Sequence, residues 1–385
     1  MQTASRIGFS AVGAVALLVS MTVGAEAQQP GDGRVRVDTL ADGRIVVSNP
    51  DSPQTGPRGV STFVEELRIG SLDGTCDAFG DVASLAVDGD GRIYVADRQA
   101  RAIRVFAPQG ECVRTFGRSG EGPGEFRWLE GIAWQPPGYL WAIDAIQSRL
   151  TVFDSLGTVL ATHPVNLGPG ASMPWPLWVD AGGSLHIWLQ GFRSLVKYGS
   201  GPGLDSLDSF RVPEIPRELY TQTNVGNTGI SARSTIPYSP AIRWTVSPAG
   251  NLWLANSSTY AIHETTYAGD TLRTVQLDRR VPRLEGRERD SIAAAIGIAA
   301  RRLPARKSVV ERIRSSPDGW LWIETDKGAI RAWDVFDERG YYMGRVASPV
   351  PIEKEPFPVF GRGTVTAVTR DELGVQYVVR LRLGW

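Results

Sequence analysis

One short pattern recurs six times along the chain: turn-forming residues, a glycine, and then a run of apolar residues. Successive glycines of the pattern are 47, 45, 67, 69 and 44 residues apart. Three of these intervals lie near 45, a length typical of a four-stranded β-propeller blade, and two contain about 22 more residues. The shared glycines are Gly91, Gly138, Gly183, Gly250, Gly319 and Gly363.

The run after each shared glycine predicts a strand with two apolar faces. Glycine adopts positive φ without a Cβ clash, as a short hairpin loop often requires. In the first unit Ile93 and Val95 alternate with their neighbours, and Trp141, Trp253 and Trp322 fill the intervening positions of later units. A strand that is apolar on both sides lies between two layers, and sheets packed face to face provide that environment.

The rest of each unit accounts for four strands. An inner strand precedes the shared glycine, as at 84–87, and a second hairpin turns at Gly110, Gly157, Gly269 and Gly340. The sixth unit has room for only three strands. We therefore expect an all-β, six-bladed β-propeller, with five or seven blades as alternatives.

The segment 63–70 (FVEELRIG) precedes the first inner strand and has no partner of its own. We expect it to supply the missing outer strand of the last blade, which joins the ends of the ring and covers strand edges that could aggregate. The propeller then occupies 63–385 as one domain.

The first unit, 91–126, resembles the NHL repeat found in six-bladed propellers of exported bacterial proteins. The resemblance is strongest over 79–162, and it implies a scaffold used for binding in many members and for catalysis in a few. The fold does not fix the function. The matching residues are Gly91, Ile93, Tyr94, Val95, Asp97, the strand at 103–106, Gly124 and Phe126.

The first 27 residues have the pattern of a secretory signal peptide: Arg6, an uncharged apolar run at 7–23, and Ala25-Glu26-Ala27. We expect cleavage before Gln28, an N-terminal extension at 28–62, and export to the periplasm or the medium. The alternative is an uncleaved anchor, but the apolar run has 17 residues, at the lower limit for spanning a bilayer. No other apolar stretch approaches 18 residues, so we expect no membrane span in the mature chain.

The charges balance, with 41 basic and 41 acidic residues. This removes any whole-chain argument for binding nucleic acid or a membrane surface. The 43 glycines and 25 prolines fit a fold with many tight turns. The oligomeric state has no signal in the sequence.

Two insertions account for the long intervals, at about 199–240 and 278–307. The first is predicted to be an elaborated loop. The second places Ile292, Ile296, Ala299 and Leu303 on one helical face, which predicts a helix over about 285–302 that caps one mouth of the ring. Its nine basic residues indicate either a site for an anionic partner or a solvated surface. They are Arg279, Arg280, Arg283, Arg287, Arg289, Arg301, Arg302, Arg306 and Lys307.

Cys76 and Cys112 are the only cysteines. In an exported protein two cysteines favour a disulfide. Cys76 follows the closing strand and Cys112 begins the outer strand of the first blade, so a bridge would attach the closing strand to that blade.

The sequence contains no recognisable catalytic motif. The glycine-rich GRSGEGPGEF (117–126) lacks the Lys-Ser/Thr ending of a phosphate loop and leads into a strand, so we interpret it as a join between two blades. His163, His186 and His263 are not on inner strands, where zinc ligands would be expected. Asp97 and Asp144 share one repeat position and are interpreted as turn caps.

One set of carboxylates could hold a metal. Glu130, Glu311 and Glu355 each lie eight residues before a shared glycine, near the start of an inner strand at one mouth of the channel. Three carboxylates there could bind a hard cation such as Ca²⁺, or could be solvated residues at the entrance to the ring. Propellers resembling the gluconolactonases bind a metal at such a mouth, but their Glu/Asn/Asp set is not recognisable here.

These observations favour an exported binding or interaction scaffold for a protein, peptide or glycan, without a cofactor. Trp128, Trp175 and Trp178 near inner strands could offer stacking surfaces or could pack in the core. The alternative is a metal-assisted hydrolase or lyase that uses the three carboxylates at the channel mouth.

Overall fold

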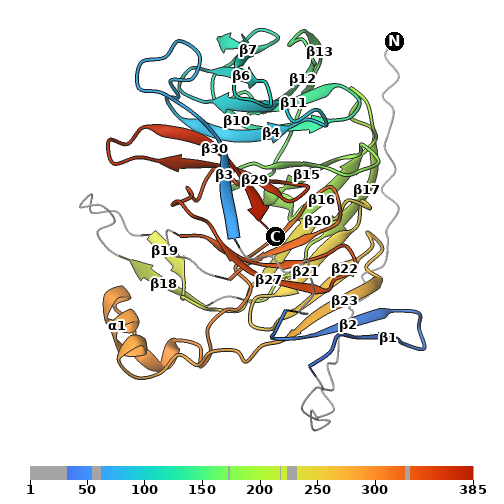
Figure 1. Cartoon of the computed structure of the whole chain (residues 1–385), viewed down its shortest axis with the longest axis vertical. Helices are drawn as coiled ribbons and strands as arrows, with labels where there is room; N and C mark the ends of the chain where they lie inside the picture. The colour runs from blue at the N-terminus through green and yellow to red at the C-terminus, as the bar shows by residue number, and fades with distance from the viewer. Residues whose placement is uncertain are drawn as a thin grey trace, which may run out of the picture. The chain divides into compact units, whose positions relative to one another are not determined.

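The structure is a computed structural model that describes residues 33–53, 62–171, 174–216, 218–222, 232–325 and 330–384. Its strands form six main sheets, which confirms the predicted six-bladed β-propeller with one α-helix (Figure 1). The predicted signal peptide at 1–27 lies outside the described residues. No helix in the described part is both long enough and apolar enough to cross a membrane.

The first three blades each have four antiparallel strands in chain order, from the channel outward. Blade 1 contains β4 (Val82–Val87), β5 (Ile93–Asp97), β6 (Ala102–Phe106) and β7 (Cys112–Phe116). Blade 2 contains β10 (Leu129–Gln135), β11 (Tyr139–Asp144), β12 (Arg149–Asp154) and β13 (Val159–Pro164). Blade 3 contains β14 (Leu177–Val179), β15 (Leu185–Leu189), β16 (Ser194–Tyr198) and β17 (Ser206–Arg211).

The other three blades repeat this order, with strands from the N-terminal part added to two of them. Blade 4 contains β20 (Ile242–Val246), β21 (Leu252–Asn256), β22 (Ala261–Thr265) and β23 (Thr271–Asp278). Blade 5 contains β24 (Arg312–Ser315), β25 (Leu321–Glu324), β26 (Ala332–Phe336) and β27 (Tyr342–Ala347). Blade 6 contains β28 (Val359–Gly361), β29 (Thr364–Arg370), β30 (Gln376–Gly384) and β3 (Thr62–Ile69).

The hydrophobic core lies between neighbouring blades. All five residues of β5 are buried, and the side chains of Trp141, Trp253 and Trp322 are at most 1% exposed. Trp322 of blade 5 packs against Phe360 of blade 6, with ring centroids 5.0 Å apart. The two apolar faces of the middle strands therefore fill the spaces between adjacent sheets, as their sequence pattern predicts.

The last blade takes its outer strand from the segment that precedes the first blade. β3 pairs antiparallel with β30, from Thr62 opposite Gly384 to Ile69 opposite Val378 (Figure 1). Glu66 of β3 forms ion pairs with two arginines of β30. A strand that precedes the first blade thus shares one sheet with the last strand of the described chain.

A hairpin within the expected extension, 28–62, adds two strands to blade 4. It consists of β1 (Arg36–Thr39) and β2 (Ile45–Pro50), and β2 pairs in parallel with β23. The buried side chain of Asn49 donates to the carbonyls of Gln276 and Gly340 at 3.0 and 2.9 Å and accepts the Tyr342 amide at 2.9 Å. Asn49 therefore attaches the hairpin to blades 4 and 5 together.

The first insertion is shorter than predicted. Residues 206–211 are not part of a loop: they form β17, whose sequence SLDSFR buries only Phe210 and so lacks an alternating apolar pattern. The remainder includes a two-stranded sheet of β18 (Leu219–Gln222) and β19 (Ala232–Thr235).

The helix of the second insertion also ends earlier than the predicted residue 302. α1 spans Gly286–Ile296 and stops at Gly297, whose φ of 69° turns the chain while its amide bonds the carbonyls of Ala293 and Ala294. The two insertions share a small core with Ile236, Leu284, Ala293 and Leu303 at its centre. The cavity described below has no lining residue from this helix among the described residues.

Most basic residues of this insertion bind their own chain. Arg289 donates to four main-chain carbonyls, and Arg302 and Lys307 form ion pairs with Glu218 and Glu288. These contacts favour a surface without an anionic partner, although several of the basic side chains bind the protein itself and are not simply solvated.

The glycine-rich join at 117–126 is a compact loop. Its short strands β8 (Arg118–Ser119) and β9 (Glu125–Phe126) pair in parallel. Arg149 of blade 2 donates to the carbonyls of Glu121, Gly122 and Glu125 at 2.7–2.8 Å. The loop thus delivers the chain from the outer strand of blade 1 to the inner strand of blade 2.

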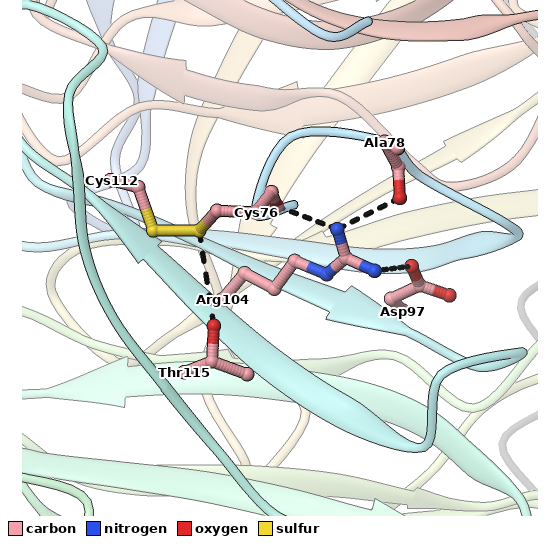
Figure 2. The surroundings of a disulfide bond; sticks show 6 residues. All are labelled: Cys76, Ala78, Asp97, Arg104, Cys112 and Thr115. Atoms are coloured by element: carbon pink, nitrogen blue, oxygen red, sulfur yellow. Dashed lines mark hydrogen bonds and ion pairs between the residues drawn. A yellow bond between two sulfur atoms is a disulfide. The ribbon is translucent and has the colours of Figure 1, made fainter. Parts of the chain in front are cut away.

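The predicted disulfide is present between Cys76 and Cys112 (Figure 2). Arg104 lies beside it and donates to the carbonyls of Cys76 and Ala78 at 2.6 and 2.8 Å, and to Asp97 at 2.8 Å. The bridge and this arginine together attach the segment after β3 to blade 1.

Candidate functional site

The inner strands of the six blades surround a central channel with a cavity of about 400 Å³. Every blade contributes lining residues, from Ala83 in blade 1 to Phe360 in blade 6. This volume lies within the range of small-molecule sites. The closed ring fixes the walls, so the site needs no large rearrangement to form.

The lining is rich in rings. Proline lacks an N–H donor, and its ring adds flat apolar surface to that of the aromatic side chains. The wall therefore suits the apolar face of a ligand. The aromatic residues are Trp134, Trp175, Trp178, Phe357 and Phe360, and the prolines are Pro136, Pro174, Pro176, Pro248, Pro317, Pro356 and Pro358.

Each acidic residue of the lining lies beside a cation of its own blade or of the neighbouring blade. Asp88 forms an ion pair with Arg92 at 3.2 Å, and Asp180 forms one with Lys197 at 3.1 Å. Glu130 lies 3.6 Å from Arg98. These carboxylates therefore contribute little net negative charge to the channel.

Arg314 of β24 differs, because it brings a positive charge to the lining without an ion pair to a described carboxylate. Its guanidinium lies over the ring of Phe357, 4.3 Å from the centroid. Burial lowers the pKa of Arg314 to about 10, and the neighbouring charge of Arg312 acts in the same direction. Arg314 remains protonated near neutral pH.

The three carboxylates predicted to hold a metal lie in different surroundings. Glu130 is buried and accepts the indole N–H of Trp128 at 2.9 Å. Its pKa is raised by burial and further by the charges of Glu355 and Asp81, against the effect of Arg98. Glu355 itself is exposed.

The buried Glu311 is 3.4 Å from Arg243. Across the described residues, no group of three or more His, Cys, Asp or Glu side chains is placed to hold a metal ion. The calcium site at Glu130, Glu311 and Glu355 stays a prediction.

The tryptophans near the inner strands separate into two groups. Trp175 and Trp178 line the channel and also pack against hydrophobic core clusters, so they have features of both interpretations. Trp128 instead bonds Glu130 and lies under the guanidinium of Arg98, 5.1 Å from its ring centroid.

Asp97 and Asp144 cap turns, as their shared repeat position predicts. Asp97 accepts the amides of Gly80, Asp81 and Ala100, and Asp144 accepts those of Arg127, Trp128 and Gln147. Each carboxylate thereby joins the end of a middle strand to the start of the inner strand of the same blade.

The histidines occupy structural positions outside the inner strands. His163 contacts the carbonyl of Pro202 at 2.7 Å, and His263 contacts the hydroxyl of Thr274 at 3.0 Å. The fully buried His186 lies between Asp180 at 3.1 Å and the hydroxyl of Tyr267 at 2.6 Å.

His186 belongs to a repeated contact between the end of an inner strand and the following middle strand. In blades 1 to 3 a polar side chain accepts a hydrogen bond from a ring six residues later, at 2.9–3.2 Å. Trp253 and Trp322 take the ring position in blades 4 and 5, opposite serines too short to reach them. The paired residues in blades 1 to 3 are Asp88 with Tyr94, Gln135 with Trp141, and Asp180 with His186.

The buried His186 predicts a loss of stability at mildly acidic pH. Burial lowers its pKa, although its hydrogen bond to Asp180 acts in the opposite direction. In the unfolded chain the histidine has an ordinary pKa near 6.5, so the unfolded state takes up the proton first as the pH falls. We expect the free energy of unfolding to decrease below about pH 6.5, by at most about 1.4 kcal/mol per pH unit for this residue.

Urea unfolding at pH 7.5 and 5.5 checks this expectation. His186→Gln keeps a polar side chain of similar size that does not take up a proton. The variant should therefore lose less stability between pH 7.5 and 5.5 than the wild type. Part of the pH dependence should persist, because burial also lowers the pKa of His263. An identical pH dependence in the two proteins would contradict the assignment to His186.

Comparison with known proteins supports the fold and leaves the activity open. Residues 78–167 match a family model described as a six-bladed β-propeller. The chain has the fold of the six-bladed β-propellers. No curated protein matches the sequence.

Among solved structures, similar ones include a Bacteroides fragilis protein thought to be exported, at 11% identity and a TM-score of 0.50 over 88% of this chain and 100% of that one. Virginiamycin B lyase from Staphylococcus aureus is 10% identical, with a TM-score of 0.46 over 84% and 100%. A gluconolactonase from Xanthomonas campestris is 13% identical, with a TM-score of 0.38 over 86% and 98%. At these identities the likeness concerns the fold alone.

Proposed function

We propose that the protein is an exported binding protein whose ligand site is the central channel. The cavity carries the proposal: all six blades line it, and its walls are aromatic and proline-rich. The ligand is a small molecule, or the end of a peptide or glycan chain, that fits about 400 Å³. Export rests on the signal-peptide pattern at 1–27, the NHL-like first blade and the disulfide.

The ring-lined walls can supply affinity to such a ligand. Aromatic faces stack on sugar rings and on the flat groups of peptides, and the packed blades hold the tryptophans in place. Trp178, for example, packs against Trp244 with ring centroids 5.0 Å apart. Little ordering is then needed when a ligand binds.

A thermal-shift screen against a defined panel of tripeptides and disaccharides tests the proposal. A ligand at 100 times its Kd stabilises the folded state by about 2.7 kcal/mol, which raises the melting temperature by a few degrees. Ala181→Trp should abolish the shift, because Ala181 is exposed at the end of the channel lining and an indole there would obstruct it.

The matched control is Ala295→Trp, which places the same side chain on the exposed surface of α1. It should keep the shift of the wild type. A ligand shift that survives in Ala181→Trp would contradict the channel as the binding site.

The alternative, a metal-assisted hydrolase or lyase, predicts a different result in the same assay. A calcium site at the channel mouth would raise the melting temperature on addition of Ca²⁺ and lower it in EDTA. For a binding scaffold we expect neither change. A stoichiometric, tightly held cation found by elemental analysis would favour the enzyme.

A further inference from the structure

Arg314 lines the channel but has no part in the ring-lined surface described above. It lies on the inner strand β24, half-buried, and lines the cavity. Its hydrogen bond to the carbonyl of Ile313 is long, at 3.4 Å, and its main contact is the face of Phe357. A guanidinium has five donors, so the described surroundings of Arg314 leave most of its hydrogen-bonding capacity unused.

The surroundings of Arg314 add positive charge. Arg312 lies over the same Phe357 ring, 5.0 Å from the centroid, and donates to the carbonyl of Lys354. Glu324 is the carboxylate whose charge acts on Arg314, and it already forms an ion pair with Arg331. Glu311 and Glu355 also act on Arg312, but Glu311 already lies beside Arg243. That leaves the exposed Glu355 to balance both Arg312 and Arg314, so the described groups on this side of the channel carry more guanidinium than carboxylate charge.

The acidic residues elsewhere in the lining do not neutralise the positive charge around Arg314. Asp88, Glu130 and Asp180 lie beside Arg92, Arg98 and Lys197, as described above. A charge in an apolar cavity is costly unless it is paired, and a bound anion would remove that cost. Charge complementarity therefore indicates that the ligand is an anion.

We propose that the channel binds an organic carboxylate, with the carboxylate paired to Arg314 and its apolar or ring-shaped body against Phe357 and the channel tryptophans. The proposal rests on the channel being the ligand site. The planar fork of arginine matches a carboxylate with two parallel hydrogen bonds, whereas lysine offers a point charge. The side chain is already held against Phe357, so less freedom is lost on binding.

Benzoate and benzamide are suitable probes, because they have nearly the same shape and differ in charge. Labelling the protein with ¹⁵N-tryptophan gives indole signals for Trp134, Trp175 and Trp178, which can be assigned by Trp→Phe variants. We expect benzoate to shift these signals and to bind about tenfold or more tightly than benzamide. The preference should weaken in high salt.

Arg314→Met should abolish the preference for benzoate, and Arg314→Lys should reduce it because the charge remains without the fork. The matched control is Arg287→Met, which removes the same charge from an exposed position in α1. It should bind as the wild type does. The comparison of benzoate with benzamide on the wild type needs no variant. It therefore tests the preference for a carboxylate even if Arg314→Met fails to fold.

The two proposals fail in different ways. If both probes bind equally and shift the channel tryptophan signals, the proposed recognition of a carboxylate is wrong and the channel remains a binding site. Absence of channel shifts with either probe would also overturn the carboxylate site, whereas the channel as a binding site is contradicted only by a ligand shift that survives in Ala181→Trp. If benzoate is preferred, tripeptides with free or amidated C-termini and methyl glucuronide against methyl glucoside distinguish a peptide carboxylate from a sugar acid.

Discussion

Asp334→Asn is expected to lower the free energy of unfolding by about 3–5 kcal/mol, as removal of one partner from a buried ion pair typically does. Asp334 is fully buried on β26. Its carboxylate accepts hydrogen bonds from Arg279 and from the hydroxyls of Tyr260 and Tyr342, the latter two at 2.6 and 3.0 Å. The variant leaves these three donors facing a neutral amide with one acceptor oxygen.

The position of this network explains why the expected loss is large. Tyr260 belongs to blade 4, Asp334 and Tyr342 belong to blade 5, and Arg279 also pairs with Asp51 just after the N-terminal hairpin, at 2.6 Å. One carboxylate thus connects two blades and the added strands. Its loss affects contacts between sheets rather than a single turn.

Urea unfolding of Asp334→Asn and Asp42→Asn measures the effect against a matched control. Asp42 also pairs with an arginine, Arg44 at 2.7 Å, but both side chains are about half exposed. Exposed pairs contribute little, so Asp42→Asn should leave the unfolding transition unchanged. Similar small losses in both variants would show that the buried network does not stabilise the contact between blades 4 and 5.

The repeat made most of the fold predictable, because each blade reuses the same physical solution. Five of the six shared glycines adopt positive φ, from 62° at Gly363 to 88° at Gly319, and Gly138 is the exception in a turn that contains two prolines. The middle strands have a two-sided apolar pattern that only stacked sheets satisfy. Both signals involve residues close together in the chain, so they can be recognised from the sequence alone.

The hairpin β1–β2 and the outer strand β17 of blade 3 were not predicted, because their sequence signals are weak. β1 is wholly exposed, and β17 buries one residue of six. The hairpin is attached by the pairing of β2 with β23 and by Asn49. A single asparagine has no sequence pattern that would indicate bonds to residues 227 and 291 positions away.

The candidate site shows the same limit. Glu130, Glu311 and Glu355 share a repeat position, which predicts that they lie at one mouth of the channel. Two of them, however, lie beside arginines that do not recur in the repeat. Arg314 occupies an inner strand reading RIRS, where one more arginine is unremarkable in sequence. Only the fold shows that it reaches an apolar channel and that Glu324, whose charge acts on it, is already paired with Arg331.

Replacing both Cys76 and Cys112 by serine is expected to lower the free energy of unfolding by about 4 kcal/mol. The bridge joins residues 36 positions apart, and the chain-entropy model gives about that value for a loop of this size. Cys112 is exposed and Cys76 is half-buried, so serine should be hydrated without leaving a cavity. The loss therefore measures the constraint on the unfolded chain.

Urea unfolding of the wild type and the double variant, each with and without reductant, separates this effect from changes in packing. Reductant should lower the stability of the wild type to that of the variant and should leave the variant unchanged. Arg104 bonds the carbonyls of Cys76 and Ala78 in either state, so the segment should keep its place once the bridge is gone. A variant as stable as the oxidised wild type would mean that these hydrogen bonds, and not the disulfide, hold the closing strand to blade 1.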